Sequence, residues 1–242
     1  LPREVLCEGY AGPDVARPLS MQPAHIAADQ RLITDLAARI AKANFPVVFA
    51  QHGAGNAEAF AALSALVNRW AIPVCQYWAV QLALPTDHDM HAGGDPAPLL
   101  EQADLVIVLD SLAPWSQQAH VVRDDATVVH IGPDPLKART PIRNFRSDIS
   151  IIGELPDAIL ALQSELDAHQ TGTDVDARRA DIVKANAQAR HAALTKAEAG
   201  RDGVMSADYV AKTVSEAIAG RNASLLSERG CPMEAMTLDH HQ

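Results

Sequence analysis

The stretch ADLVIVLDS, residues 103–111, decides the fold. Five consecutive apolar residues, 105–109, stand between polar ones, and the run is too short for a helix of ordinary length. An unbroken apolar run of this kind is typical of a strand buried on both faces, as in a parallel sheet covered by helices. The flanking sequence must then supply further strands and the helices that cover them.

Strand-like and helix-like segments alternate on both sides of this run. Helical spacing of apolar residues occurs at 29–43, 56–70 and 155–166, with a short helix expected near 98–102. This alternation predicts an α/β fold, a Rossmann-like parallel sheet with helices on both faces. The five predicted strands are 46–50, 72–77, 103–111, 126–132 and 147–153.

The remaining chain divides around this sheet. Residues 1–25 are predicted to be a tail and connector, because 9–25 carry three prolines and two glycines without apolar periodicity. Residues 26–168 form the predicted Rossmann-like domain, and 169–203, charged and Ala-rich, an exposed helical linker. From 204 to 242 the pattern restarts, with Ser206 as a candidate N-cap and a strand at 223–228. Too few elements follow to close a core, so we expect an incomplete second α/β element.

Composition excludes several classes of partner. The net charge is −10, with 30 acidic residues against 20 Lys and Arg, whereas phosphate backbones are bound by clustered cations, so nucleic acid is not expected. No stretch approaches the roughly 20 apolar residues that cross a bilayer, so no membrane partner is expected. Three widely spaced cysteines, at 7, 75 and 231, build no disulfide framework or CxxC motif and predict a cytoplasmic location.

Polar residues at strand ends are the first candidate binding residues. QHGAGN (51–56) follows a strand and opens a helix, where backbone N–H groups and the helix dipole favour an anion. A tight turn capped by Asn56, without a ligand, explains this loop equally well. Asp110 and Ser111 end the strongest strand, at the edge where open parallel sheets bind ligands, although an ordinary polar strand end is the simpler interpretation.

Two loops and the chain end gather ionisable residues. Residues 130–148 form a basic cluster in an acidic chain, which suits a phosphate or a carboxylate face of another subunit. Its cations are Lys137, Arg139, Arg143 and Arg146. The loop DHDMHAGG (87–94) has two histidines and two aspartates, but without regular spacing it is a poor metal cage, so a solvated loop is predicted. GRDG (200–203) is interpreted as a turn. MTLDHHQ (236–242) finds no further ligand at a defined spacing, so no metal site is assigned.

Several segments together resemble thiamine diphosphate (ThDP) enzymes of the acetolactate synthase type. LPREVL (1–6) is similar to the end of their pyrimidine-binding domain, and ERGCPMEAMTLDHHQ (228–242) to the first strands of their diphosphate-binding domain. FPVVFAQHGAGN (45–56), QADLVIVLDS (102–111) and HIGPDPL (130–136) are similar to their central domain. Order and spacing agree across the chain, so the resemblance implies a central domain, with the tail of the pyrimidine domain at 1–25 and the truncated start of the diphosphate domain at 204–242.

The resemblance also implies cofactor-binding residues. DHHQ matches Gly-Gln-His-Gln of acetolactate synthases, which lies beside the cofactor's diphosphate, so His240, His241 and Gln242 are assigned to that site. The departures at Asp239 and His240 indicate a different substrate preference.

The resemblance also includes a nucleotide-side loop. Gly53 and Gly55, followed by Asn56, match the nucleotide-side loop of the central domain, which holds FAD in acetolactate synthase and ADP in oxalyl-CoA decarboxylase. FAD-binding members show Gly-Ala-Arg-Phe where this chain has Asp110 to Ala113. The absence of that Arg and Phe favours an empty cleft.

The resemblance implies a thiamine pyrophosphate-requiring transferase or lyase that acts on a 2-oxo acid, with ThDP and Mg²⁺ as cofactors and a homo-oligomeric assembly. The family's catalytic glutamate and its magnesium motif belong to the two neighbouring domains, so no catalytic or metal residue is assigned and this chain alone is expected to be inactive. A stand-alone nucleotide-binding module and an assembly module are the alternatives that the sequence leaves open.

Overall fold

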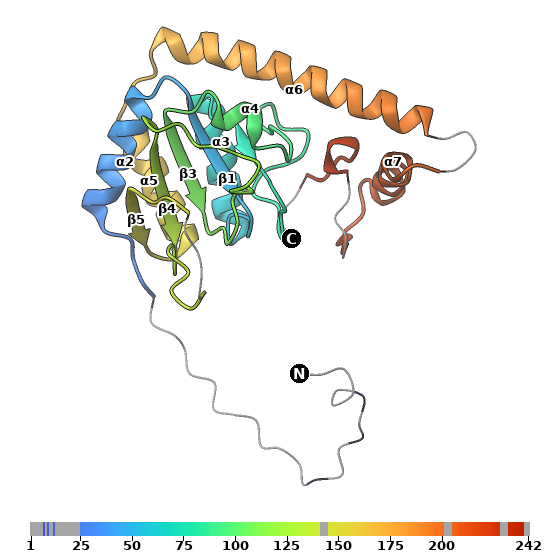
Figure 1. Cartoon of the computed structure of the whole chain (residues 1–242), viewed down its shortest axis with the longest axis horizontal. Helices are drawn as coiled ribbons and strands as arrows, with labels where there is room; N and C mark the ends of the chain where they lie inside the picture. Colours follow the sequence, from blue (N-terminus) through green and yellow to red (C-terminus); the bar gives the residue numbers. More distant parts are fainter. Residues whose placement is uncertain are drawn as a thin grey trace.

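A five-stranded parallel sheet of order β2-β1-β3-β4-β5 forms the centre of the computed structural model (Figure 1). The structure describes residues 7, 9, 12, 25–140, 145–200, 205–227 and 232–239. The strands are β1 (Pro46–Ala50), β2 (Val74–Cys75), β3 (Leu105–Leu109), β4 (Thr127–Gly132) and β5 (Ile149–Ile152). All five predicted strands are confirmed, β2 as a short one.

The helices begin where the sequence provides side-chain caps. They are α2 (Gln30–Lys42), α3 (Ala57–Trp70), α4 (Ala97–Leu100), α5 (Leu155–Asp167), α6 (Thr173–Ala199), α7 (Ala207–Ile218) and the 3₁₀ turn η1 (Met233–Ala235). The Asn56 side chain accepts a hydrogen bond from Ala59 N, and Ser206 accepts one from Tyr209 N. Each satisfies a backbone N–H at a helix start that has no partner within the helix, so both predicted caps are confirmed.

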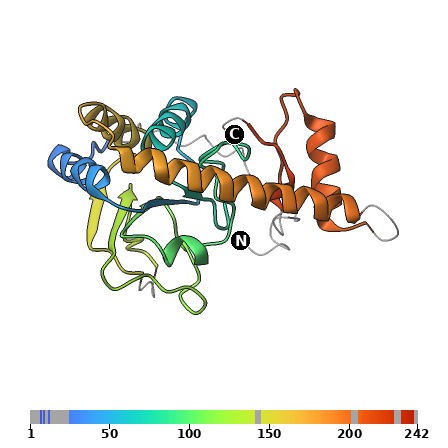
Figure 2. The ribbon, with the colours of Figure 1, turned by 90° about the horizontal axis from the view of Figure 1, so that it is seen from above.

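Apolar side chains pack on both faces of the sheet. Helices α2, α3 and α5 cover one face with a large apolar cluster that includes Ile33, Trp70 and Ile159 (Figure 2). On the other face, α4 and the segment around Trp115 cover Phe49 and Val108. Strand β3 is buried along its whole length, as its sequence predicts. The α/β fold with helices on both faces is therefore confirmed.

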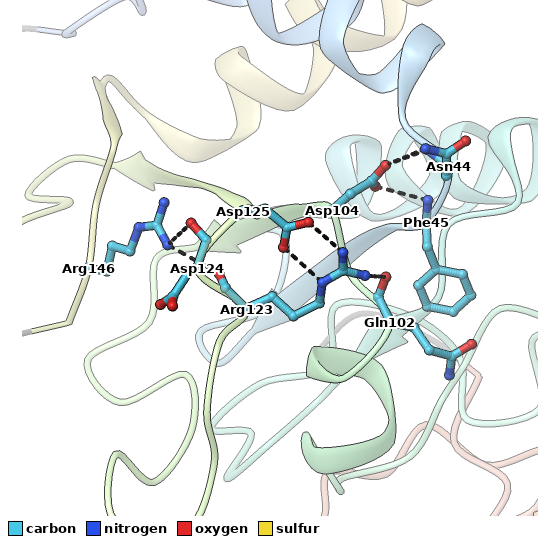
Figure 3. Close-up of polar contacts among 8 residues, drawn as sticks. All are labelled: Asn44, Phe45, Gln102, Asp104, Arg123, Asp124, Asp125 and Arg146. Atoms are coloured by element: carbon cyan, nitrogen blue, oxygen red, sulfur yellow. Dashed lines mark hydrogen bonds and ion pairs between the residues drawn. The ribbon is translucent and has the colours of Figure 1, made fainter.

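The basic cluster predicted at 130–148 is not one site. Arg146 lies at the edge where the strands begin and donates to the carbonyls of Arg123 and Asp124, both at 3.2 Å (Figure 3). Lys137 lies beyond the opposite end of β4 and pairs with Asp110. Arg139 is exposed, and Arg143 lies outside the described residues. Because β4 and β5 are parallel, Lys137, which follows the end of β4, and Arg146, which precedes the start of β5, lie at opposite edges of the sheet.

Carboxylates also organise the edge in Figure 3. Asp104, just before β3, accepts hydrogen bonds from the backbone N–H groups of Asn44 and Phe45 at 2.7 and 2.9 Å. Arg123 pairs with Asp125 just before β4. The Asp104 contacts tie the starts of β1 and β3 together, at the edge opposite the one where open parallel sheets bind ligands.

The loop predicted at 87–94 is solvated only in part, because Asp87 and Asp89 are exposed but the residues that follow them are not. Met90 is fully buried and His91 is 7% exposed. Val74 N donates to Met90 O at 2.8 Å, and Ala92 N donates to Val74 O at 2.9 Å. The segment therefore runs beside β2 as an extra edge of the sheet. The polar sequence of this segment does not predict the pairing, because backbone groups rather than side chains form it.

The linker helix is confirmed as α6, but one face of its first half is buried. Val175, Arg178 and Ile182 recur on one face of the helix and are buried against the sheet domain. Figure 1 shows α6 reaching from the sheet domain to α7. These two apolar residues and one arginine belong to the docked face of a helix whose other residues are mostly charged or Ala.

The restart after residue 204 is confirmed only for its helix. Residues 223–227 have no regular secondary structure, so the strand predicted at 223–228 is wrong for the described residues. Leu226 is 94% exposed and Leu225 only half-buried, so the apolar pair that suggested a strand is not buried as a strand of the sheet would be. Most of the connector at 9–25, the turn at 201–203 and the end of the chain at 240–242 lie outside the described residues.

Candidate functional site

Strands β1, β3 and β4 end at one edge of the sheet, and Gln51 organises that edge. Its side chain is 8% exposed. The amide oxygen accepts from Leu112 N at 2.8 Å and from Ser111 Oγ at 3.2 Å, while the amide nitrogen donates to Trp78 O at 3.3 Å. One side chain thus ties the ends of β1 and β3 to the loop that follows β2.

Asp110 is the centre of a charged cluster at the same edge. The residue has φ 33°, a left-handed conformation that costs energy for any residue with a Cβ. Its carboxylate pairs with Lys137 Nζ, and its backbone carbonyl accepts from His52 Nδ1. The Lys137 and Asp110 side chains are only 17% and 20% exposed. The positive charge of Lys137, just after β4, is therefore already paired with a carboxylate of the protein itself.

The glycines of QHGAGN lie against protein atoms. Gly53 has φ 72°, and a Cβ placed there would lie 2.9 Å from Leu82 O. Gly55 has φ 91°, and its Cβ would lie 2.7 Å from Pro156 Cγ. Each position requires glycine because of its backbone angle and its close neighbour. The turn itself explains the glycines, and a cofactor role for Gly53, Gly55 and Asn56 stays a prediction.

Among the described residues, no contact at this edge points to a nucleotide diphosphate. The space beside both glycines is filled by Leu82 and Pro156, and Lys137 is already paired. We therefore derive no chemistry through FAD or ADP at this edge.

The segment Met236–Leu238 is held by three side chains from three elements, which we call the C-terminal clamp: Thr86, Arg190 and Ser215. Thr86 Oγ1 donates to Met236 O at 2.9 Å and accepts from Leu238 N at 3.0 Å, and Thr86 N donates to Leu238 O at 2.9 Å. The clamp therefore joins the far end of the chain to the loop after β2.

The other two members of the clamp come from α6 and α7. Arg190 of α6 donates to Met236 O at 3.0 Å and to Thr237 Oγ1 at 2.7 Å. Ser215 of α7 accepts from Thr237 N at 2.8 Å. Every backbone N–H and C=O of Met236–Leu238 has a hydrogen-bond partner, as in a strand inside a sheet.

The clamped segment leads directly to the predicted cofactor residues. His240, His241 and Gln242 lie outside the described residues, so their place beside a diphosphate stays a prediction. Within the part of the chain that the structure describes, no three His, Cys, Asp or Glu side chains form a group that holds a metal ion. None of the described helices has the length and apolar composition needed to span a membrane.

Comparison with known proteins identifies the class. The model of the family "Thiamine pyrophosphate enzyme, central domain" matches residues 33–162, more than half of the chain. The chain therefore belongs to the thiamine pyrophosphate enzyme family, and the matched part is its central domain. No curated protein matches the chain.

Two solved structures are similar to the chain. One, described as a thiamin diphosphate-dependent enzyme from Mycobacterium smegmatis, shares 22% identity over 65% of this chain and 31% of that one, with a TM-score of 0.46. The other is benzoylformate decarboxylase from Polynucleobacter necessarius, with 18% identity over 69% of this chain and 32% of that one and a TM-score of 0.50. At this identity the second similarity shows the fold alone. The chain spans about a third of the length of either protein.

Sequence reasoning missed the clamp and the docking arginine. Thr86, Arg190 and Ser215 stand in three separate segments and match no motif. Arg178 carried a weak signal, because it shares a helical face with Val175 and Ile182. The signal was missed because an arginine in a charged helix is usually solvated.

Proposed function

We propose that this chain is the central part of a ThDP-dependent enzyme of the acetolactate synthase type, which decarboxylates or ligates 2-oxo acids as a homo-oligomer. The observation that carries the proposal is the match of residues 33–162 to the family's central domain. The Met236–Leu238 segment supports it, because the clamp holds the chain that leads to the DHHQ motif against that domain.

In this proposal the chain contributes one wall of the cofactor site. When bound, ThDP supplies the electron sink for loss of carbon dioxide from a 2-oxo acid. His240, His241 and Gln242 offer imidazole and amide N–H donors, which suit phosphate oxygens. The clamp holds the backbone up to Leu238, two residues ahead of the first of these donors. Asp239 and His240 are the positions where substrate preference would differ from acetolactate synthase.

Residues 1–242 alone are expected to be inactive. The family resemblance assigns the glutamate that activates the cofactor, and the motif that holds Mg²⁺, to domains outside these residues. Calorimetry with ThDP and Mg²⁺ tests this, on residues 1–242 and on the chain extended along its natural reading frame on both sides. We expect binding and release of carbon dioxide from pyruvate only for the extended chain. Tight ThDP binding by residues 1–242 would show that the fragment interpretation is wrong.

Product analysis tests the finer assignment. Acetolactate formed from pyruvate by the extended chain supports the acetolactate synthase type, whereas benzaldehyde formed from benzoylformate without acetolactate contradicts it. In the extended chain, His241→Ala should weaken ThDP binding by about tenfold, the effect of losing one charge-assisted hydrogen bond. The matched control is His191→Ala, which removes an exposed histidine of α6 and should leave binding unchanged.

A further inference from the structure

Large apolar side chains are exposed along the edge of the sheet at which the strands end. Trp78 is 76% exposed and Val80 67%, and Leu112 and Leu136 are half-exposed. These four residues, which we call the apolar edge, belong to the segments that follow β2, β3 and β4. Apolar side chains gathered in one region mark an interaction site, whereas scattered single ones need no explanation.

Hydrogen bonds to Gln51 bring three members of the apolar edge together. The backbone carbonyl of Gln51 accepts from Val80 N at 2.7 Å. Its side-chain amide donates to Trp78 O at 3.3 Å and accepts from Leu112 N at 2.8 Å. Since all three residues are bonded to one residue at the end of β1, they lie side by side there.

Backbone strain is a second observation at the same edge. The φ angle is 50° at Trp78, 33° at Asp110 and 48° at Lys137, a left-handed conformation that costs energy for residues with a Cβ. Such conformations gather where a protein binds or acts. The pairing of Lys137 with Asp110 also brings the neighbouring Leu136 close to the end of β3.

The N-terminal connector joins the sheet domain at this same edge. Glu154, just past β5, donates its backbone N–H to Ile26 O at 2.8 Å. Gly153 packs so closely on Ala28 that a Cβ on the glycine would lie 2.8 Å from Ala28 N. Ile26 and Ile152, the last residue of β5, are themselves exposed. Exposed apolar side chains therefore begin where the connector arrives and continue to the segment after β2.

The part of the connector just ahead of this point has the length and composition to lie along the edge. It is PDVARPLSMQPA, residues 13–24, which are outside the described residues. Twelve extended residues span up to about 40 Å, whereas the four strand spacings from β5 to β2 amount to about 19 Å. Its three prolines favour an extended backbone at their own positions and at the residues before them.

We propose that residues 13–24 bind along the apolar edge as an extended segment. Its three large apolar side chains pack on that edge: Val15, Leu19 and Met21. Proline-rich segments bind exposed aromatic side chains in this way, because little conformational entropy is left for them to lose. The bound connector occupies the edge at which open parallel sheets bind ligands, so this edge serves as a contact between two parts of one chain.

Electrostatics favours the connector over a second copy of the chain as the occupant. Residues 13–24 carry one acidic and one basic residue, so their charge does not oppose binding. A second copy would bring a net charge of −10 to a chain that already carries −10, and like charges repel.

Paramagnetic relaxation, measured by nuclear magnetic resonance on residues 1–242, tests the proposal. A nitroxide is attached through Ser20→Cys, after Cys7 and Cys231 have been replaced by serine. The remaining cysteine, Cys75, is buried and does not compete for the label.

We expect the nitroxide to broaden the indole N–H resonance of Trp78 and the amide resonance of Leu112. Broadening should be much weaker for the amide of Asp104, which lies at the opposite edge of the sheet. A Trp78 resonance that stays sharp, or equal broadening at Trp78 and Asp104, would overturn the proposal.

Variants of the connector make the test specific. Leu19→Ser should lower the equilibrium constant for docking by about tenfold, the effect of losing one buried apolar side chain, and the Trp78 resonance should sharpen. The matched control is Gln22→Ser, which changes a polar residue of the same segment and should leave the broadening as it is. Equal broadening in the two variants would contradict the docking of residues 13–24.

A mixed sample separates docking within one chain from docking between two. It combines nitroxide-labelled chains at natural isotope abundance with ¹⁵N-labelled chains that carry no nitroxide. We expect no broadening at Trp78 in this sample, and broadening there would assign the apolar edge to a second copy and overturn the proposal. ThDP takes no part in these experiments, so their result is independent of the proposed function.

Discussion

Replacing Arg178 by alanine tests whether a buried guanidinium docks α6 on the sheet domain. Arg178 is 8% exposed. It donates to Trp70 O and Asn44 O, both at 2.8 Å, and to Ala71 O at 3.0 Å. These carbonyls lie at the end of α3 and just before β1, so one side chain joins α6 to two elements of the sheet domain.

The expected loss of stability in Arg178→Ala follows from these hydrogen bonds. A hydrogen bond from a charged donor contributes about 1.5–3 kcal/mol, and the cost of burying the guanidinium offsets part of the sum. Loss of these three bonds and of a longer fourth, to Ala43 O at 3.3 Å, with carbonyls left unpaired, should lower the free energy of unfolding by about 3–4 kcal/mol. For a chain of this size the midpoint of thermal unfolding should fall by roughly 6–16 °C.

The neighbouring residue provides the matched control. Arg179 donates to the carbonyls of Asn68 and Arg69 from a more exposed position. Arg179→Ala removes the same side chain from the same helix and should cost only about 1 kcal/mol. The assay is thermal unfolding followed by circular dichroism, together with limited trypsin digestion, which should cut α6 early in Arg178→Ala alone. Equal losses in the two variants would refute the assignment of docking to Arg178.

Three further predictions concern the clamp, the buried histidine and the buried thiol. Thr86→Val should speed hydrogen exchange of the Leu238 amide by at least about tenfold, whereas Thr86→Ser should not, and equal rates would rule out the clamp. Because the folded pKa of His91 is about 4, below its unfolded value near 6.5, the unfolded chain binds the extra proton first. The protein should thus lose about 3 kcal/mol of stability as pH falls from 6.5 to 4. This loss, measured by urea unfolding, should disappear in His91→Gln and persist in His191→Gln. Burial raises the pKa of Cys75 to about 12, so iodoacetamide at pH 8 should label it only after unfolding, as peptide mass spectrometry would report.

The strands and most helices were predictable from local sequence. Leu105 to Leu109 form a strand because a doubly covered sheet buries five adjacent apolar side chains. Asn56 and Ser206 begin helices because their side chains accept from backbone N–H groups three residues further on. The 223–228 run has a similar apolar appearance, yet it forms no strand within its described residues. The two segments differ in the elements that pack around them, and a local sequence pattern does not reveal those elements.

The sequence by itself determined the class of this protein, because apolar periodicity and the family resemblance are both written along the chain. Only the tertiary structure decided which polar residues meet. Lys137 and Arg146 lie at opposite edges of the sheet, because one follows the end of β4 and the other precedes the start of β5. Thr86 and Leu238, by contrast, are hydrogen-bonded although they are 152 positions apart. The burial of His91 was likewise decided by backbone pairing with Val74. Contacts of this kind depend on how helices and strands pack against one another, and no short stretch of sequence reveals that packing.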